Sequence, residues 1–118
     1  MGYLQQGDVL KIEHIKYPVL VVSKDFFNTS RAIIGCPIIS DSMAGPLHIW
    51  TSLENAEGYI QCEKLRLLDL SVRGYKKINR LPMSEIINVS DAIQGIFEYI
   101  WYIWNIKTDG YGGKNGGY

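Results

Sequence analysis

The first eighty residues of the chain alternate short apolar runs with polar, turn-rich pieces. Apolar and polar side chains alternate over residues 9–15, which predicts a strand with Leu10, Ile12 and His14 on one face. The β-branched run Val19–Val22 has the length of a buried strand. Further strands are predicted over residues 32–39, where Pro37 indicates an edge or a bulge, and over 47–50, 59–62, 65–70 and 77–81, with loops over 25–30 and 40–46. Five to seven short strands with frequent turns predict a small β-barrel.

The period of the pattern changes at Pro82. A proline fits the first turn of a helix, and Ser84 and Glu85 supply capping chemistry. Apolar residues then recur every three or four positions, which predicts an amphipathic helix from about Pro82 to Asn105. The predicted fold class is therefore mainly β with a C-terminal helix. The apolar stripe consists of Ile86, Val89, Ile93, Phe97, Ile100 and Trp104.

The end of the predicted helix is apolar nearly all round, from Ile100 to Trp104. One barrel surface cannot cover both faces of a terminal helix, so we expect a second subunit to cover the other face. The chain is therefore predicted to form a homodimer with Trp101 and Trp104 in the interface, because aromatic side chains bury large areas. Residues 1–106 are predicted to form one domain, and the glycine-rich residues 107–118 a disordered tail.

The composition is that of an ordinary globular domain. The 118 residues fit one domain, 47% of them are hydrophobic, and twelve acidic and twelve basic side chains cancel. A nucleic-acid site therefore needs a local basic cluster. No apolar signal segment is present, and no apolar run approaches the ~20 residues of a membrane span, which predicts a cytoplasmic protein without membrane contact.

The cysteines and histidines do not form a metal-binding motif. Cys36 and Cys62 lie within apolar runs, which indicates buried thiols in a reducing compartment. The chain has no Cys-x-x-Cys, and His14 and His48 are far apart in the sequence. We therefore expect no metal and no cofactor.

Several short pieces occur in an order and spacing that resemble one protein family. They are Gly7-Asp8-Val9, Pro18-Val19-Leu20-Val21-Val22-Ser23, Phe27-Asn28, Cys36-Pro37-Ile38-Ile39-Ser40, Gly58-Tyr59-Ile60-Gln61-Cys62-Glu63, Leu65-Arg66-Leu67-Leu68-Asp69 and Arg80-Leu81-Pro82. From about Gly7 to Phe97 the chain resembles the MazF/PemK/Kid family of toxin–antitoxin ribonucleases.

The resemblance implies an SH3-like barrel with a C-terminal helix, in a homodimer whose active site lies in the dimer groove. It implies a type II toxin that cleaves single-stranded mRNA without a metal ion. In that reaction the ribose 2′-hydroxyl attacks the phosphate and leaves a cyclic phosphate and a 5′-hydroxyl. The resemblance also implies a cognate antitoxin whose disordered tail fills the groove.

The chain departs from the family's usual residues at a few positions. Tyr17, beside Lys16, replaces an arginine, and Ile39 replaces a threonine that is often followed by a serine, here Ser40. An Arg-x-Asp piece of some members becomes Gln61-Cys62-Glu63, which keeps the carboxylate and loses the cation. The loop between the first two strands is shorter than is typical of the family.

Cleavage of this kind needs a base and groups that stabilise the phosphorane. Lys16 is predicted to supply the cation, Ser40 to hold a non-bridging oxygen and Glu63 to orient the ribose. His14 is the predicted base, because histidine titrates near neutral pH. The predicted RNA-binding residues are Tyr17, Gln61, Arg73, Lys76 and Lys77.

Structural interpretations of these residues stay open beside the functional ones. Lys16 also fits a solvated loop, His14 a half-buried strand position, and Trp50 the core rather than a stacking surface. Two other functions are also open. One is an inactive relative that binds RNA or an antitoxin, as the replaced arginine and threonine suggest. The other is a CcdB-like gyrase poison, because Trp104-Asn105-Ile106 is similar to the C-terminal Trp-Gly-Ile of those proteins.

Overall fold

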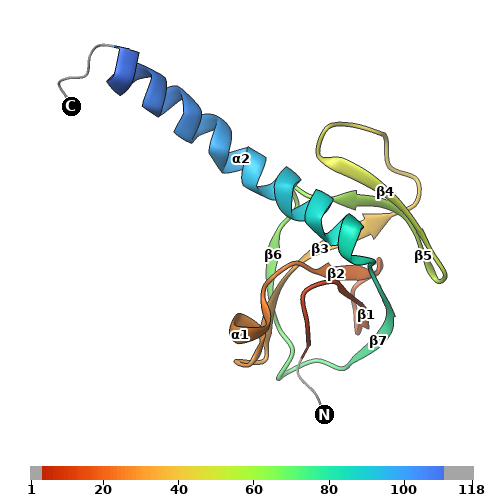
Figure 1. Ribbon diagram of the computed structural model, residues 1–118. Coiled ribbons are helices and arrows are strands. Elements are labelled where there is room, and N and C mark those ends of the chain that lie inside the picture. The colour runs from red at the N-terminus through yellow and green to blue at the C-terminus, as the bar shows by residue number, and fades with distance from the viewer. Residues whose placement is uncertain (1–3, 111–118) are drawn as a thin grey trace.

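The computed structural model describes residues 4–110, and their side chains as far as Phe97 with the exception of Phe26. Figure 1 shows the strands and helices of this part of the chain. The strands are β1 (Asp8–Ile12), β2 (Val19–Val21), β3 (Ala32–Ile39), β4 (His48–Leu53), β5 (Ala56–Gln61), β6 (Arg66–Asp69) and β7 (Tyr75–Arg80). The helices are α1 (Asp25–Asn28) and α2 (Met83–Gly110).

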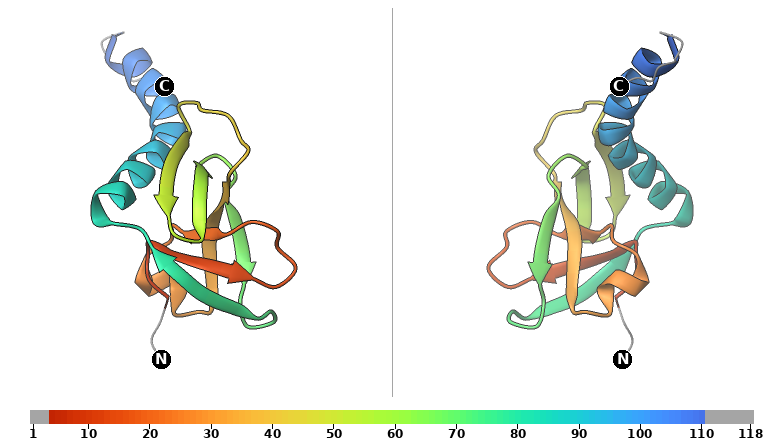
Figure 2. Two further views of the ribbon diagram at one scale, coloured as in Figure 1. Left: turned by 90° about the vertical axis from the view of Figure 1, so that its right-hand side faces the viewer. Right: turned by 90° about the vertical axis from the view of Figure 1, so that its left-hand side faces the viewer.

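The strands form one bent antiparallel sheet. Their order is β4-β5-β3-β2-β1-β7, and β6 pairs with β3 beside this path. Strands β1 and β7 run across the direction of β4 and β5, so the sheet curls into a half-barrel (Figure 2). Helix α2 follows β7 and packs across the sheet (Figure 1). The structure therefore confirms the predicted fold class, mainly β with a C-terminal helix.

Strand β3 is central and changes partner along its length. One edge pairs with β2, while the other pairs first with β6 and then, from Ile38, with β5. The N–H of Ile38 donates to the Pro18 carbonyl beside β2 (2.9 Å), so the nitrogen of Pro37 points to the other edge, between β6 and β5. The prediction of an edge or a bulge at Pro37 is wrong, because the proline lies in a central strand where no donor is needed.

Buried apolar side chains form two clusters, to which alternate residues of β1 and β2 contribute. Val9 and Leu20 belong to the cluster that contacts α2. Leu10, Val19 and Val21 belong to the other, together with residues of β3 and β6. Both faces of β2 are therefore covered, which explains why this strand is apolar at every position.

The predicted apolar stripe anchors the first half of α2 to the sheet. Ile86 and Val89 are buried in the cluster under the helix, and Ile93 packs against it. The hydroxyl of Thr51 on β4 donates to the Glu85 carboxylate in the first turn of α2 (2.9 Å). These contacts confirm the start of the helix just after the proline and the inward face of its first three turns.

The second half of α2 extends past the sheet (Figure 1). Phe97 is 62% exposed, so this member of the predicted stripe is not covered within one chain. The side chains of Ile100, Trp101 and Trp104 lie outside the described ones. The helix continues to Gly110, beyond the predicted end at Asn105. Most of the predicted tail, residues 111–118, lies outside the described residues.

Several elements of the first sixty residues differ from the sequence prediction. Strand β1 ends at Ile12, because His14 has a positive φ of 66° that ends the extended chain. Residues 25–28 of a predicted loop form one helical turn, α1, with Asp25 at its start. Strand β5 begins at Ala56 rather than Tyr59, because a tight turn with Asn55 at φ 67° joins it directly to β4.

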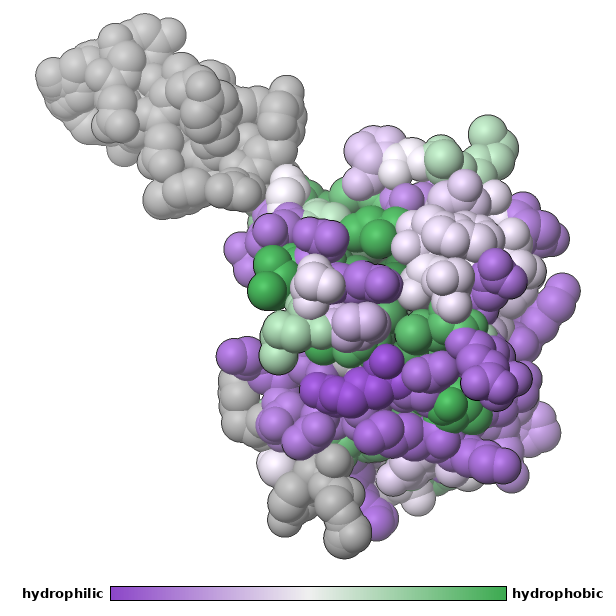
Figure 3. Space-filling view, turned by 45° about the vertical axis from the view of Figure 1, so that its right-hand side comes forward, coloured by the Kyte–Doolittle hydropathy of each residue, from purple (hydrophilic) through white to green (hydrophobic). Residues whose placement is uncertain are grey.

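The surface combines one apolar area with broad polar regions. On the face in Figure 3, hydrophobic side chains (green) gather near α2, and hydrophilic ones (purple) form a band across the sheet. Among the described residues, no helix has the length and apolar character of a membrane span.

Candidate active site

Two predicted catalytic residues, Lys16 and Ser40, belong to neighbouring strand ends. Val19 of β2 is paired with Pro37 of β3 in an antiparallel register. The paired residues end at Val19 and Pro37, with one further bond from the Ile38 N–H to the Pro18 carbonyl, so Lys16 and Tyr17 lead into β2 at the same end of the strand pair at which Ser40 leaves β3. Ser40 is exposed, and the Lys16 ammonium lies 5.2 Å from the centre of the Tyr17 ring. A lysine and a hydroxyl thus flank one edge of the half-barrel.

Gly58 of β5 allows the backbone to approach closely behind Ser40. A Cβ atom at this position would lie 2.8 Å from the backbone nitrogen of Ser40 and 2.8 Å from the carbonyl carbon of Ile39. The φ of Gly58 is 157°, a conformation that side chains disfavour. The glycine in the matching family piece therefore fixes the position of the serine.

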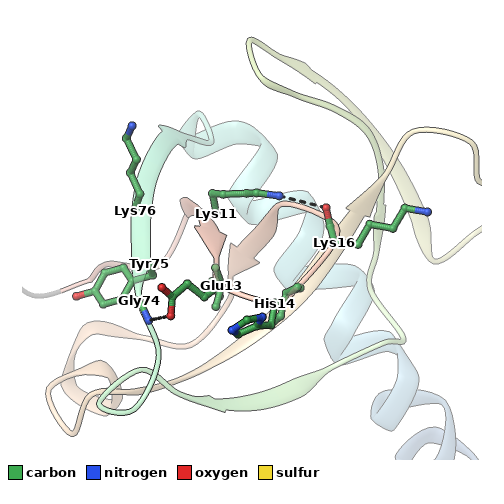
Figure 4. Close-up of a pocket in the computed structure, with 9 residues that line it drawn as sticks. Lys11, Glu13, His14, Lys16, Gly74, Tyr75 and Lys76 are labelled. Atoms are coloured by element: carbon green, nitrogen blue, oxygen red, sulfur yellow. Dashed lines mark hydrogen bonds between the residues drawn. The ribbon is translucent and has the colours of Figure 1, made fainter.

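An open pocket of about 660 Å³ lies between the β1–β2 loop and the start of β7 (Figure 4). Lys16 and His14 both line it, so the structure brings the predicted cation and the predicted base into one cavity. His14 is exposed there in a turn, and not on the inward face of a strand as one interpretation of the sequence had it. Its ring is therefore accessible to a ligand.

The fourth predicted catalytic residue, Glu63, lies beyond the other end of β5. Ser40 follows the Ile39–Tyr59 pair, whereas Glu63 comes four residues after Tyr59. At about 3.3 Å per residue, this places Glu63 roughly 10 Å or more from Ser40 within one chain. The structure therefore does not bring Glu63 together with the other three residues.

Glu63 is instead the partner of His48 on β4. The two ring nitrogens of His48 face two acceptors, the Met43 carbonyl (2.6 Å) and the Glu63 carboxylate (2.9 Å). Only the imidazolium donates to both, so the bonds to Glu63 and then to Met43 raise the pKa of His48. For Glu63, partial burial acts to raise the pKa, but the bond from His48, a backbone hydrogen bond and the charges of His48 and Lys64 together outweigh it, and the pKa is lowered.

The His48–Glu63 pair predicts a pH-dependent stability. A raised histidine pKa stabilises the fold below its ordinary value of 6.5 and loses that effect as pH rises through the folded value. The lowered pKa of Glu63 adds stability above its ordinary 4.5. We therefore expect His48→Ala to lower the thermal midpoint most between about pH 4.5 and 6.5 and less at pH 9, as measured by circular dichroism. In a Glu63→Gln background this pH dependence should become smaller, because the bond to the Met43 carbonyl still raises the pKa of His48. An undiminished dependence there would assign it to other groups.

The predicted RNA-binding residues take different positions in the structure. Lys76 lines the open pocket, and Tyr17 is half-buried beside Lys16. Lys77 instead forms an ion pair with Asp8 (3.2 Å), a buried carboxylate that also binds Arg80 (2.7 Å). Arg73 is half-buried in the turn before β7.

Gln61 is the predicted RNA-binding residue that the structure disfavours most. Its side chain is buried, with 1% of the residue exposed, and the amide donates to the Tyr59 carbonyl (3.0 Å). A buried amide with a partner supports the strand rather than a ligand. RNA contact through Gln61 stays a prediction, but it requires a change in this part of β5.

Three residues outside the predicted site are accessible in the structure. Trp50 is 47% exposed and contacts Tyr59 edge to face, so its interpretation as a core tryptophan is wrong. His48 holds Glu63, and Lys11 lines the open pocket. Side chains alternate along β4, so Trp50 lies on the opposite face of the strand from the buried Thr51. The sequence itself indicates this exposure, because Trp50 alternates with apolar residues of the strand.

The two cysteines are buried and free, as predicted. Burial raises the pKa of Cys36 to about 12 and that of Cys62 to about 11. Neither thiol is therefore a nucleophile at neutral pH. Within residues 4–110, no three side chains of the metal-binding types gather as ligands would.

The protein is thus a small half-barrel domain closed by one helix, with polar groups at the strand ends around an open pocket. A family model of the "PemK-like, MazF-like toxin of type II toxin-antitoxin system" matches residues 8–97. The chain therefore belongs to the PemK/MazF toxin family. No curated protein sequence matches the chain.

Solved structures of this family share the fold at low sequence identity. MazE–MazF from Deinococcus radiodurans (Form-I) is 17% identical with a TM-score of 0.74, over 83% of this chain and 99% of that one. An endoribonuclease from Mycobacterial species is 14% identical with a TM-score of 0.71, over 83% and 94%. An endoribonuclease in complex with its cognate antitoxin, also mycobacterial, is 13% identical with a TM-score of 0.69, over 80% and 95%.

Proposed function

We propose that this protein is a type II toxin that acts as a metal-independent endoribonuclease on single-stranded mRNA in the cytoplasm. The observation that carries the proposal is that Lys16 and His14 line one pocket, while Ser40 leaves β3 at the end of the strand pair at which Lys16 leads into β2. Membership of the PemK/MazF family and the fold shared with endoribonucleases support it.

In the proposed reaction His14 removes the proton of a ribose 2′-hydroxyl. The 2′-oxygen bonds to the adjacent phosphorus, the bond from phosphorus to the 5′-oxygen breaks, and that oxygen takes a proton from water. The products are a 2′,3′-cyclic phosphate and a 5′-hydroxyl. Lys16 neutralises the charge that develops on the phosphorane, and Ser40 donates to a non-bridging oxygen.

Glu63 has a separate part in the proposal. Its carboxylate is held by His48 beyond the other end of β5. We propose that it orients a part of the RNA that is distant from the bond that breaks. This position follows from the strand register and differs from direct contact with the attacking ribose.

The proposal is tested with purified protein and a long single-stranded RNA in the presence of a chelator. We expect cleavage at defined sites, 5′ ends that need phosphorylation before ligation, and 3′ ends that carry a cyclic phosphate. Expression without an antitoxin should also stop bacterial growth. Cleavage that the chelator abolishes would contradict the mechanism.

A binding protein without catalysis is the second candidate. The apolar Ile39 and the aromatic Tyr17 stand where the family carries a threonine and an arginine. Under this alternative the protein binds RNA or the antitoxin but leaves RNA intact, and its expression does not inhibit growth. Retention of full-length RNA on the folded protein is the result that favours it.

A homodimer is proposed from the projecting half of α2. Phe97 is 62% exposed there, and the sequence that follows it in the helix, from Ile100 to Trp104, is apolar nearly all round. We expect light scattering to give the mass of a dimer, and Trp101→Glu to give a monomer or an aggregate. Asp91→Ala, an exposed change on the same helix, is the control and should remain dimeric. A monomeric parent protein would contradict the proposal.

The partner is proposed to be a cognate antitoxin. Related structures contain MazF with MazE and an endoribonuclease with its cognate antitoxin. Co-expression with the protein encoded beside this chain is expected to restore growth and to yield a stable complex.

A further inference from the structure

The open pocket holds more positive charge than the predicted catalytic residues account for. Its lining contains three lysines, Lys11, Lys16 and Lys76, and a single carboxylate, that of Glu13. With His14 neutral, these side chains give the pocket a net charge of +2 in a chain whose total charge is zero. The basic cluster that a neutral nucleic-acid-binding protein requires is therefore concentrated here.

Lys11 and Lys76 are directly opposite each other in the β1–β7 register. Both are exposed, while the neighbours of Lys11 in β1, Leu10 and Ile12, are buried, so the two lysines share the outer face of the sheet. Opposed like charges on neighbouring strands destabilise a sheet. This arrangement lowers stability in the free protein, and the binding of an anion between the two lysines removes that cost.

No carboxylate among the described residues neutralises these lysines. The ion pairs of the described part involve His48, Lys77 and Arg80, and none of the three pocket lysines. Among the described residues, the Lys11 ammonium has one hydrogen-bond partner, the Lys16 carbonyl, at 3.4 Å (Figure 4).

Glu13 is hydrogen-bonded to the wall of the pocket. Its carboxylate accepts the Gly74 N–H (2.9 Å), while its own N–H donates to the Gly74 carbonyl (2.9 Å), which ties the β1–β2 loop to the start of β7. The carboxylate therefore shapes the pocket and leaves the three ammonium groups available to a ligand.

We propose that Lys11 and Lys76 form a phosphate-binding subsite that holds the RNA backbone next to the bond that is cut, an inference that rests on the proposed function. Lys16 lines the same pocket and leads into β2 at the end of the strand pair at which Ser40 leaves β3, so an RNA strand with its scissile phosphate at Lys16 extends into the pocket. The subsite binds backbone phosphates of single-stranded RNA and does not read bases. Lys11 and Lys76 are binding residues and take no part in the bond changes.

The test measures binding of a single-stranded 2′-O-methyl RNA oligonucleotide, which lacks the attacking hydroxyl and is not cleaved. The affinity of the parent protein and of Lys11→Ser/Lys76→Ser is followed against salt concentration. Each phosphate contact in single-stranded nucleic acid contributes about 0.7 to the slope of log affinity against log salt, so the double variant should lower the slope by about 1.4. Lys11→Arg/Lys76→Arg keeps the charges and should restore the slope.

Lys24→Ser/Lys64→Ser is the matched control, because it removes two exposed lysines outside the pocket. It should bind with the parent's slope. With cleavable RNA, the pocket variant is expected to raise KM and leave kcat unchanged, whereas a change at Lys16 lowers kcat.

The outcomes separate this inference from the proposed function. If the parent cuts RNA and the pocket variant binds with the parent's slope, the subsite is overturned and the nuclease stands. If the parent binds RNA through the two lysines but does not cut it, the subsite stands and the nuclease fails. If the parent binds no RNA, or if an oligoglutamate peptide binds through the lysines in its place, the subsite is overturned.

Discussion

Lys16→Ala is expected to slow RNA cleavage by about a hundredfold or more, the usual cost of losing one electrostatic contact to a transition state. Lys16 lines the open pocket and leads into β2 at the end of the strand pair at which Ser40 leaves β3. Its side chain is exposed, and its ammonium contacts only the Tyr17 ring among the described residues. The loss should therefore appear in kcat, measured with a labelled single-stranded RNA, while circular dichroism shows an unchanged fold.

Three further variants locate the rest of the site. Ser40→Ala and His14→Ala are expected to lower kcat, and Glu63→Ala is expected to act more on KM because Glu63 lies at the far end of β5. Lys64→Ala is the control for an exposed lysine beside that carboxylate. If all four folded variants of the predicted residues cut as fast as the parent, the site lies elsewhere on the protein.

Most of the fold follows from local pattern. The β-branched run of β2 predicts a strand buried on both faces, and the change of period after Pro82 predicts a helix with one buried face. Each pattern lies within a single element, and the structure confirms both predictions. Pro37 shows where this reasoning fails. A proline in a strand indicates an edge when partners are assumed to run the full length of the strand. In β3 the partner changes from β6 to β5 at the proline, and this depends on the path of residues distant in the chain.

The site was less predictable, because it depends on register. Resemblance to the family predicts Lys16 and Ser40, and the pairing of β2 with β3 puts them at the same end of two neighbouring strands. Glu63 is predicted in the same way, but its partner, His48, is fifteen residues away across the β4–β5 hairpin. Lys11 carried no sequence signal, since its position opposite Lys76 depends on a β1–β7 pairing that joins the two ends of the sheet.

Basic residues also differ in whether their charge is available to a ligand, and the composition alone does not show this difference. Lys76 and Lys77 are adjacent in β7, yet Lys76 lines the pocket and Lys77 pairs with the buried carboxylate of Asp8. A shift in register within the β1–β7 pair places both Lys77 and Arg80 on that carboxylate. The basic residues of β7 are thus divided, because Lys76 lines the pocket while Lys77 and Arg80 pair with a buried charge.

Gly58→Ala is expected to destabilise the fold by about 2–4 kcal/mol, which is the sum of a strained backbone and an overpacked contact. An added Cβ would lie within 2.9 Å of three backbone atoms of Ile39 and Ser40, and backbone cannot rotate away as a side chain does. The φ of 157° at Gly58 adds the cost of a conformation that alanine avoids. Because the displaced atoms carry Ser40, the variant should also lose cleavage activity at temperatures where it is still folded.

Urea denaturation at fixed protein concentration measures this effect, through the midpoint and the slope of the transition. Gly95→Ala is the matched control, because a Cβ at Gly95 meets nothing within 4 Å and the residue lies inside α2. Alanine is favoured over glycine in a helix, so this variant should be more stable by about 0.5–1 kcal/mol. A Gly58→Ala protein as stable and as active as the parent would show that Ser40 is not held by the close approach of β5, and it would remove the structural reason for placing the catalytic hydroxyl there.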